Sequence, residues 1–331
     1  MLLLTTLLAL SGLVTSSRVN NTPKYYYLKD AIYHFDTFKN KHGKIYPDVE
    51  EETKRLEIFK GNLQRINYLN DLENDTVHGL TMFVDLTDEE FTSIHACFVN
   101  PLDSGSCEEV TDVQDSGAPE EFDWRDYNAV TEVKNQGHCG SCWAFGSTGA
   151  LEGAYALKYK ELTAFSEKQL MDCDKDANGC DGGNMADAFS YLMSAGGAMT
   201  EQDYPYQPAV GSCKFDAGKV KARVTQCYTF NLQGDEEKLK QLLHARGPIT
   251  IGVNSVPMRT YDGTSVLKIC DPYMINHSVL LVGYGTDNGT PYWLIKNSWG
   301  LNYGIGGYIK ILRGNNVCGL MNPSMAIPVV A

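Results

Sequence analysis

The eleven residues from Asn135 to Phe145, NQGHCGSCWAF, contain the most reactive group of side chains in the sequence. Cys139 and Cys142 could form a redox pair, a metal-binding knuckle, or a nucleophile beside a structural cysteine. A redox motif of this spacing needs a compact strand–helix–strand unit, which the flanking sequence does not predict. A zinc site needs a second close pair of cysteines, whereas residues 173 and 180 are farther apart. The nucleophile is therefore the favoured interpretation.

The position of Cys142 supports that interpretation. A helix predicted from Ser141 to about Lys160 places Cys142 in its first turn, where the helix dipole and the unpaired N–H groups favour a thiolate. Glycines at 146, 149 and 153 weaken an isolated helix, so they suggest a buried helix that other backbone approaches closely.

A cysteine nucleophile needs a base, and the sequence has seven histidines. His138 adjoins the nucleophile but lies on a loop that leads away from it, and His244 ends an amphipathic helix. His277 begins the apolar run HSVLLVGYG, and Asn297 ends the next one, where its amide could orient the imidazole. Trp299 could shield that hydrogen bond from water. A single histidine is more often structural and a single Asn is often a turn residue, but Cys, His and Asn together favour nucleophilic catalysis.

The elements that position these residues fall into two groups. Helical patterns begin at Ser141, at Ser166 with its capping partner Gln169, at GNMADAFSYLMSAGG, and after Asp235. Strands are predicted later in the chain, at ITIGVN, HSVLLVGYG, PYWLIKNSW, GYIKILR and AIPVV. Helices followed by strands predict an α+β fold of two lobes, with the site in the cleft between them.

The N-terminal third differs in chemistry from the rest. Residues 1–17 contain an apolar run too short to cross a bilayer and are predicted to be a secretory signal peptide. Residues 1–117 carry 10 Lys and Arg against 19 Asp and Glu, whereas residues 118–331 carry 18 against 22. The stretch from Gly105 to Glu121 is polar and broken by Gly and Pro, so it predicts a linker.

Charge and secretion limit the partners of the protein. A formal net charge of −13 argues against nucleic acid and anionic membrane surfaces. No later segment has the length of a membrane span. A secreted chain can form disulfides and carry N-linked glycans. Asn20, Asn74 and Asn288 lie in acceptor triplets, and Asn74 and Asn288 are the predicted sites. Asn276 also matches but is expected to line the cleft.

CGSCW with a downstream His and Asn resembles the papain family of cysteine proteases, and the resemblance extends over nearly the whole chain. GCDGGNMADAF, GPITIGV and NSWGLNYGIGGYIKI are similar to further family segments. Upstream, a helical run is similar to cathepsin-L-like propeptides, and its spacing places the matching side chains on one helix face with a favourable i,i+4 ion pair. These residues are Glu51, Arg55, Phe59, Asn62, Ile66 and Asn70. GLTMFVD (residues 79–85) resembles the second propeptide motif, with Thr81 where Asn is commoner.

The resemblance implies an inhibitory propeptide at residues 18–117 and a papain-like peptidase domain at 118–331, with a helical left lobe and a β-barrel-like right lobe. It makes Cys142 the nucleophile, His277 the ion-pair partner and general acid, and Asn297 the group that orients it. Gln136 would bind the oxyanion together with the Cys142 backbone N–H. The reaction is then acyl transfer through a thioester, followed by hydrolysis.

The resemblance also implies disulfides and subsites. It pairs Cys139 with Cys180, Cys173 with Cys213 and Cys270 with Cys318, and it leaves Cys227 free and buried. Cys97 and Cys107 receive no partner from it. The residues implied in substrate binding are Gly182, Gly183, Met185, Gly252, Ile275, Ser278, Trp299 and Pro323. Since no charge lies at the base of this pocket, we expect an apolar residue two positions before the cut bond, in an endopeptidase.

Within the family, FDWRDYNAVTEVKNQG and LMSAGG look most like the viral cathepsins of insect baculoviruses. An insect-type lysosomal cathepsin and an inactive protease-like binding protein are the alternatives. The expected partners are protein and peptide substrates, the chain's own propeptide and cystatin-type inhibitors, with no cofactor or metal and a monomeric enzyme. The precursor is expected in the endoplasmic reticulum, that of the host if viral, and the enzyme in the lysosome or outside the cell.

Overall fold

The computed structural model describes residues 25–95 and 106–331. The predicted signal peptide, Asn20 and Cys97 lie outside the described residues. In the described part, no helix combines the length and the apolar character needed to cross a membrane.

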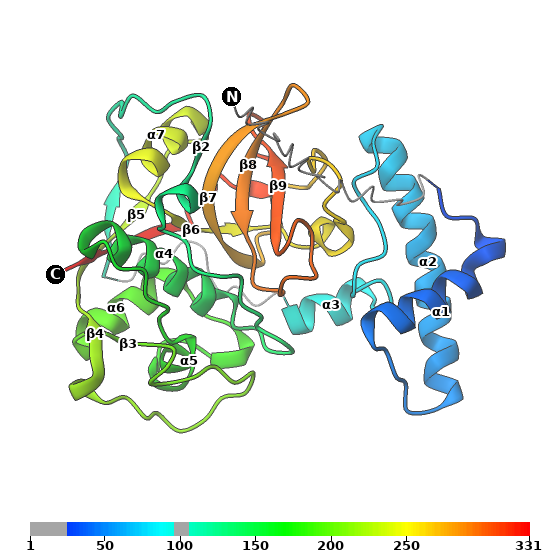
Figure 1. The fold of residues 1–331 in the computed structure, drawn as a ribbon, viewed down its shortest axis with the longest axis horizontal. Helices are drawn as coiled ribbons and strands as arrows, with labels where there is room; N and C mark the ends of the chain where they lie inside the picture. The colour runs from blue at the N-terminus through cyan, green and yellow to red at the C-terminus, as the bar shows by residue number, and fades with distance from the viewer. Residues whose placement is uncertain (1–24, 96–105) are drawn as a thin grey trace, which may run out of the picture.

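Three helices form the N-terminal segment: α1 (Ala31–His42), α2 (Val49–Glu73) and α3 (Asp88–His95), after a short 3₁₀ turn at Leu28–Asp30. In Figure 1, α1 and α2 cross at one end of the molecule and α3 leads back toward the sheet. The Asp48 side chain caps α2 by accepting the Glu51 N–H, and apolar side chains from α1 and α2 form a separate small core. This segment thus has a core of its own and is a distinct folding element.

The left lobe is built on three helices: α4 (Cys142–Tyr159), α5 (Glu167–Cys173) and α6 (Met185–Ala195). All three begin within a residue or two of the predicted positions. The Ser166 hydroxyl accepts the Gln169 N–H at 2.9 Å, and α6 ends in a left-handed Gly196 with a φ of 90°. Both details are the caps that the sequence predicts.

Glycines allow α4 to lie against the sheet without a gap. A Cβ at Gly146 would lie 2.3 Å from the Ser278 Oγ, and one at Gly153 would lie 2.7 Å from the Pro248 ring. The close approach expected from the sequence is therefore present, but the neighbours are mainly side chains of the sheet and its loops rather than backbone.

The right lobe contains most of a large sheet with the order β1-β5-β10-β6-β7-β8-β9, to which β2 adds by pairing with β7. The strands β6, β7, β8, β9 and β10 coincide with the five predicted runs. Helix α7 (Glu236–Arg246) follows its Asp235 cap as expected. The strands are β1 (Glu108–Val110), β2 (Phe122–Asp123), β5 (Val224–Phe230), β6 (Ile249–Val253), β7 (His277–Asp287), β8 (Thr290–Lys296), β9 (Tyr308–Leu312) and β10 (Met325–Val330). A separate pair joins β3 (Ala198–Met199) to β4 (Val220–Ala222).

Two expectations for this sheet need correction. The barrel-like lobe is an open sheet, because within the described residues no strand joins β9 back to β1; the Leu267 backbone covers the outer edge of β9 instead. The polar stretch 105–121, predicted to be a linker, contains β1, which pairs in parallel with β5. Local composition cannot reveal a strand whose partner lies more than a hundred residues away.

Four disulfides connect the described residues. Cys139–Cys180, Cys173–Cys213 and Cys270–Cys318 are the pairs implied by the family resemblance. The fourth, Cys107–Cys227, shows that the expectation of a free Cys227 was wrong. The partner was missed because Cys107 was assigned to a linker, whereas β1 lies beside β5 and brings the two sulfurs together.

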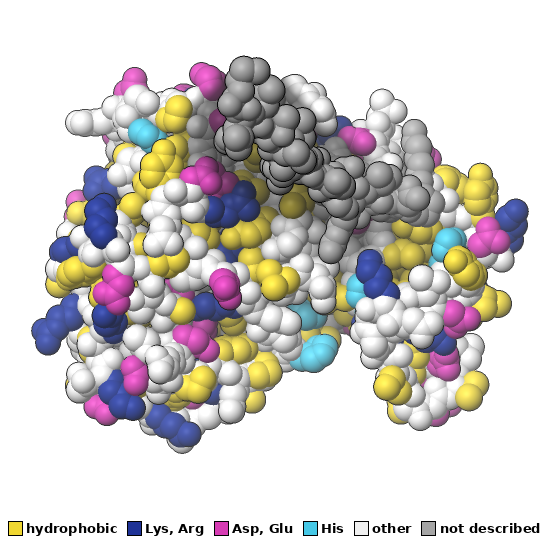
Figure 2. Space-filling model, viewed as in Figure 1, with side chains coloured by type: hydrophobic (Ala, Val, Ile, Leu, Met, Phe, Trp, Pro, Cys, Tyr) yellow, Lys and Arg dark blue, Asp and Glu magenta, His cyan; other side chains and the backbone are white. Residues whose placement is uncertain are grey.

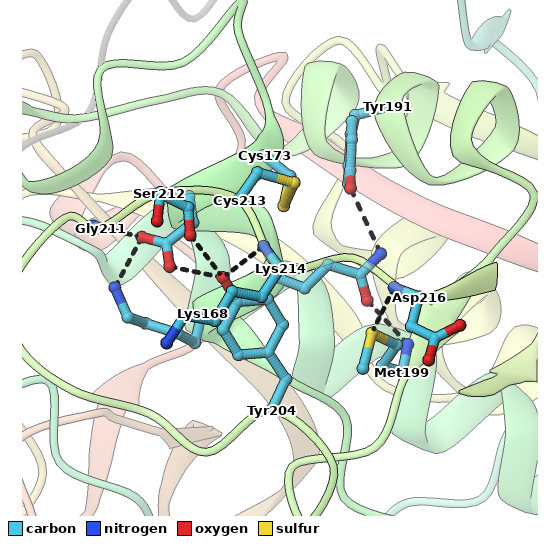
Figure 3. The surroundings of a disulfide bond; sticks show 12 residues. Lys168, Cys173, Tyr191, Met199, Tyr204, Gly211, Ser212, Cys213, Lys214 and Asp216 are labelled. Atoms are coloured by element: carbon cyan, nitrogen blue, oxygen red, sulfur yellow. Dashed lines mark hydrogen bonds and ion pairs between the residues drawn. A yellow bond between two sulfur atoms is a disulfide. The ribbon is translucent and has the colours of Figure 1, made fainter. Parts of the chain in front are cut away.

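The Cys173–Cys213 bond fastens a long loop of the left lobe to α5 (Figure 3). Beside it, the Tyr204 hydroxyl donates to Asp172 at 2.6 Å and accepts the Lys214 N–H at 3.1 Å. Lys168 and the Gly211 N–H also donate to Asp172, at 2.6 and 2.7 Å. A covalent bond and a shared carboxylate therefore hold this irregular loop in one conformation.

The surface shows how the N-terminal segment is placed. On the face in Figure 2, a notch separates part of the N-terminal helices from the rest of the molecule, and positive and negative side chains are interspersed without a patch of one sign. The contacts between the two parts come from the end of α2, from the stretch that follows it and from α3, for example through Glu73, Gly79 and His95.

Candidate active site

The strongest candidate nucleophile, Cys142, is the first residue of α4 and is fully buried. Among the described residues it is the one cysteine outside a disulfide. The backbone N–H of Ser278 points at its sulfur, with an N–Sγ distance of 3.4 Å. The N-terminus of α4 therefore meets the start of β7 at this sulfur, across the two lobes.

His277 is the residue immediately before Ser278, so the same contact brings it to the nucleophile. Its Nε2 lies 2.8 Å from the Asn297 Oδ1. That oxygen also accepts the Ser298 N–H at 2.8 Å, so it acts as an acceptor and the proton belongs on Nε2. The hydrogen bond leaves Nδ1 on the opposite side of the ring, the nitrogen that can exchange a proton with a neighbouring sulfur.

Trp299 covers this histidine. The two rings stack with centroids 4.8 Å apart and planes inclined by 24°, and the Tyr303 ring packs edge-on against the indole. Burial lowers the pKa of His277 to about 4, although the hydrogen bond to Asn297 and the backbone of His95 act in the opposite direction. In this state the imidazole is neutral at neutral pH.

Gln136 lies in the loop before α4 and is fully buried. Its Nε2 donates to the Cys139 carbonyl at 3.0 Å, and its Oε1 accepts the Ser298 hydroxyl at 2.7 Å. The Gln136 backbone N–H also donates to the Ser298 carbonyl at 2.8 Å. These bonds tie the loop of the nucleophile to the loop of Asn297 and fix the side-chain amide beside α4.

The predicted subsite residues form two groups. Gly252 faces Ser278 across β6 and β7, and a Cβ on Gly252 would lie 2.8 Å from Ile275. Met185 and Pro323 line one small cavity.

Gly182 and Gly183 precede α6, on the nucleophile's lobe. Gly182 has a φ of 117°, a conformation that L side chains rarely adopt. A Cβ on Gly183 would lie 2.5 Å from the Trp143 ring, so Gly183 is needed for packing whatever its role toward a substrate.

The predicted glycan acceptors are both exposed. Asn74 ends α2 with a φ of 50°, and Asn288 forms the left-handed turn between β7 and β8 with a φ of 48°. Asn276 instead accepts hydrogen bonds from the Ser255 N–H and hydroxyl through its side-chain oxygen.

The N-terminal segment covers the site, and the sequence did not identify the side chains that do so. Phe83, Phe91 and His95 all contact Trp299, with ring centroids 5.2, 5.5 and 6.2 Å away. Burial, with the nearby His138 and His277, lowers the pKa of His95 to about 3. Of the three, only Phe83 lies in a segment that the sequence singled out, the propeptide-like motif GLTMFVD.

A second contact missed by the sequence analysis is made by Arg259, which is 1% exposed. Its guanidinium pairs with Asp88 at 2.9 Å and donates to the Asn62 Oδ1 at 2.9 Å and to the Leu86 carbonyl. Thr81 donates to the Arg259 carbonyl. Asn62 therefore accepts a hydrogen bond from Arg259 through its side-chain oxygen, while its side-chain N–H groups donate to the Val84 and Leu86 carbonyls.

A buried cluster of charges lies behind the site. Glu152 and Glu167, each 1% exposed, share the Lys134 ammonium at 2.8 and 2.6 Å. Lys296 donates to Thr131 at 2.8 Å, and Thr131 donates to Glu152 at 2.5 Å. Burial lowers the pKa of Lys296 to about 8, while the lysines hold that of Glu152 below its usual range. This cluster connects α4 to β8, which ends one residue before Asn297, and no local sequence pattern predicted it.

Comparisons with known proteins agree with this geometry. A family model described as papain family cysteine protease matches residues 118–327, and one described as cathepsin propeptide inhibitor domain matches residues 35–91.

Two curated relatives and one solved structure illustrate the similarity. A viral cathepsin of Spodoptera litura multicapsid nucleopolyhedrovirus is 38% identical over 327 residues, 96% of this chain and 96% of its own. A probable cysteine protease of Arabidopsis thaliana is 43% identical over 316 residues, 88% of this chain and 85% of its own. The digestive procathepsin L2 from the larval midgut of Tenebrio molitor superposes with a TM-score of 0.81 at 34% identity, covering 90% of this chain and 99% of that one.

Proposed function

The chain belongs to the papain family of cysteine proteases and is a precursor with a cathepsin-type inhibitory propeptide. On this basis we propose a catalytic role for each residue of the site. Cys142 attacks the peptide carbonyl as a thiolate, and His277 takes and returns the proton. The observation that carries this proposal is the pair of contacts around His277: Asn297 on Nε2 and the Cys142 sulfur beside Ser278. The adjacent residues His277 and Ser278 therefore supply the base and a backbone N–H that contacts the nucleophile's sulfur.

Asn297 and Trp299 act on the histidine rather than on the substrate. The Asn297 carbonyl keeps the proton on Nε2, and the stacked indole excludes water from that bond. Gln136 supplies a side-chain N–H to the oxyanion, together with the Cys142 N–H at the start of α4. The first half of the reaction yields a Cys142 thioester and the free amine, and water activated by His277 then hydrolyses the thioester.

The specificity pocket accepts an apolar side chain two positions before the cut bond. Its walls are Met185, Gly252, Ile275, Ser278 and Pro323, none of which is charged. A library of peptides varied at that position should show preference for Leu, Val or Phe; a preference for Lys or Arg would contradict the assignment.

The precursor is divided into a signal peptide at residues 1–17, a propeptide at 18–117 and a peptidase domain at 118–331. We place the precursor in the secretory pathway, where its disulfides form, with glycans on Asn74 and Asn288. The released enzyme is a monomer whose open cleft binds protein substrates and cystatin-type inhibitors. Its destination is the lysosome or the extracellular space.

Mutation of the nucleophile tests the mechanism. Acidified wild-type precursor should shorten and gain peptidase activity, whereas Cys142→Ala should do neither. On enzyme already freed of its propeptide, His277→Ala should lower kcat/KM by at least about 10³-fold and Gln136→Ala by about 10²–10³-fold.

His138→Ala is the matched control, because His138 is exposed and adjoins the same loop. It should leave kcat/KM of the mature enzyme unchanged. A Cys142→Ala variant that still cleaves peptides would refute the mechanism.

The relatives named viral cathepsins favour a viral origin. In that case the enzyme degrades host tissue late in infection, after storage as a precursor in the host endoplasmic reticulum. The alternative is an insect-type lysosomal cathepsin. Deleting the coding sequence from a virus that carries it should leave infected larvae intact after death; normal tissue breakdown would favour the alternative. An inactive protease-like binding protein is disfavoured because Cys142, His277, Asn297 and Gln136 are all present.

A further inference from the structure

The disulfide between Cys107 and Cys227 joins two parts of the chain that were expected to separate. Cys107 precedes the start of the family-matched peptidase region at residue 118. Cys227 lies in the middle of β5 and is fully buried, and Cys107 is 8% exposed. This bond therefore crosses the boundary between propeptide and peptidase.

Backbone pairing holds the same segment in place. Strand β1 adds in parallel to β5, with Glu108, Glu109 and Val110 opposite Tyr228, Thr229 and Phe230. The Asn231 N–H donates to the Val110 carbonyl at 3.1 Å, and the Gln226 side chain donates to Glu108 at 2.9 Å. The strand is an integral member of the large sheet (Figure 1), in which it covers the edge of β5.

The residues on either side of β1 also contact the peptidase. The Ser106 N–H donates to Ser190 in α6 at 2.9 Å. Ser116 bonds Gln241 and His244 in α7, at 2.9 and 3.0 Å, and the Ala118 N–H donates to the same Gln241 at 3.2 Å. Within the described residues, the hydrogen bonds that this segment makes with other elements lead to β5, α6 and α7 and not to α1–α3.

The inhibitory helices are held elsewhere. They contact the peptidase through Trp299 and Arg259 and through a loop where the Glu73 carboxylate accepts the Ile269 N–H at 2.8 Å. These contacts are with Trp299, Arg259 and Ile269, whereas the contacts of β1 and its flanks are with β5, α6 and α7. The two parts of the N-terminal region are therefore anchored independently, and one can leave while the other stays.

Maturation hydrolyses peptide bonds, which consumes water and transfers no electrons, so it leaves a disulfide intact. We propose that residues 107–117 remain bound to the mature peptidase as a strand anchored by the Cys107–Cys227 disulfide. A cut at or before Cys107 gives one chain that begins with the strand. Cuts both before Cys107 and near Ala118 release the inhibitory helices and give two chains joined by the disulfide. In either case the structural boundary of the enzyme lies before β1, not at residue 118.

The test compares masses with and without reduction. Wild-type precursor is matured by acid in thiol-free buffer, alkylated, and measured by intact mass spectrometry and N-terminal sequencing. The unreduced mature protein should contain residues 107–117, and a proteolytic digest should yield a peptide in which Cys107 is bonded to Cys227. An unreduced mass accounted for by residues 118–331 alone would overturn the proposal, as would a Cys227 alkylated as a free thiol.

The inference rests on the proposed function only for the timing of the cut, and a second arm separates the two. The Cys142→Ala precursor cannot mature itself and is trimmed with added pepsin instead. Retention of the strand there supports the proposal even if the wild-type chain has no peptidase activity, and its loss from the unreduced sample contradicts the proposal.

A Cys107→Ser/Cys227→Ser variant is the matched control for the covalent bond. Where the wild-type enzyme has two chains, the strand should be lost from this variant under denaturing, unreduced conditions. Should the variant fail to fold, the wild-type masses still decide the question.

Discussion

His277 is a fully buried imidazole whose surroundings change when the propeptide leaves. In the precursor, Trp299 covers one face of the ring, and the backbone of the propeptide residue His95 lies near it. Burial is the main cause of its low pKa, about 4. Removal of the propeptide admits water to the cleft, so the charged imidazole should become easier to form.

We therefore predict that the pKa of His277 rises on maturation. NMR titration of histidine-labelled Cys142→Ala precursor should show the His277 imidazole neutral until about pH 4, and the same resonance should titrate at higher pH after the propeptide is removed. His277→Gln identifies the resonance, and His138→Ala serves as the control. An unchanged titration would show that burial by the propeptide is not the cause.

Glu152 is the residue on which the buried charges converge. It accepts from Lys134, from the Thr131 hydroxyl and, at 3.1 Å, from the Phe165 N–H. Glu152→Gln keeps the shape but leaves two buried ammonium groups with one carboxylate. Since removing one partner of a buried ion pair typically costs about 3–5 kcal/mol, we expect a loss of that size in the free energy of unfolding.

Urea denaturation monitored by tryptophan fluorescence measures this loss. The control is Glu161→Gln, which removes an exposed partner of Lys221 and should leave the midpoint almost unchanged. Equal effects of the two substitutions would contradict the importance of the buried cluster.

At the scale of elements, the distance between α4 and the sheet sets the geometry of the site. Cys142 begins α4 and His277 begins β7, and the two elements touch one turn further along, where Gly146 meets Ser278 and Thr250. A Cβ at Gly146 would lie 2.3 Å from one hydroxyl and 2.4 Å from the other. A side chain there must displace both hydroxyls, which bond each other, or move the helix away from the strands.

Gly146→Ala should therefore lower activity more than stability. Overpacking of this kind costs about 1–3 kcal/mol, and a displacement of the nucleophile by about 1 Å can cost about 10²-fold in rate. Gly61→Ala in α2 is the control, because no atom lies within 4 Å of the added methyl group; there the substitution should stabilise the precursor by about 0.5–1 kcal/mol. Thermal denaturation of both precursor variants, and kcat/KM of the mature Gly146→Ala and wild-type enzymes, check the prediction; Gly61 is removed on maturation, so Gly61→Ala controls stability only.

At the scale of the whole molecule, burial keeps three propeptide histidines neutral. The pKa values of His42 and His78 are lowered to about 4, and that of His95 to about 3. An unperturbed histidine has a pKa of about 6.5. Such a group binds fewer protons in the docked state, so its contribution to docking is complete above about pH 6.5 and is lost as the pH falls toward 4. Of the three, His78 and His95 contact the peptidase, through Thr260 and Trp299.

Docking of the propeptide should therefore weaken on acidification by up to about tenfold per pH unit for each of these two histidines. The lowered pKa of Asp75, which bonds Ser265, acts in the same direction at lower pH, whereas burial raises the pKa of Glu73, which opposes it. Limited proteolysis of Cys142→Ala precursor between pH 7 and 4 measures the pH dependence.

The double variant His78→Gln/His95→Gln should flatten that dependence, and His34→Gln should not. The readout is the slope against pH, which a uniform loss of affinity does not change. A slope unaffected by the double variant would show that carboxylates alone respond to acid.

The sequence by itself determined the features that depend on neighbours along the chain. Capping residues located the starts of α5 and α7, β-branched runs located β6 to β10, and helical spacing predicted the Glu51–Arg55 pair, which the structure contains at 2.6 Å. The family resemblance supplied three disulfides and the order of Cys142, His277 and Asn297. In each case the information lies in local periodicity or in a motif.

Only the tertiary structure decided what depends on residues brought together from distant segments. Strand β1 is too short and too polar to be recognised without β5 beside it, so the Cys107–Cys227 bond could not be foreseen. His95 over Trp299, Arg259 against Asp88 and the charges around Glu152 each join segments far apart in sequence. Their energies come from burial, which excludes water and strengthens electrostatic interactions, and burial is set by the packing of the whole chain rather than by any stretch of it.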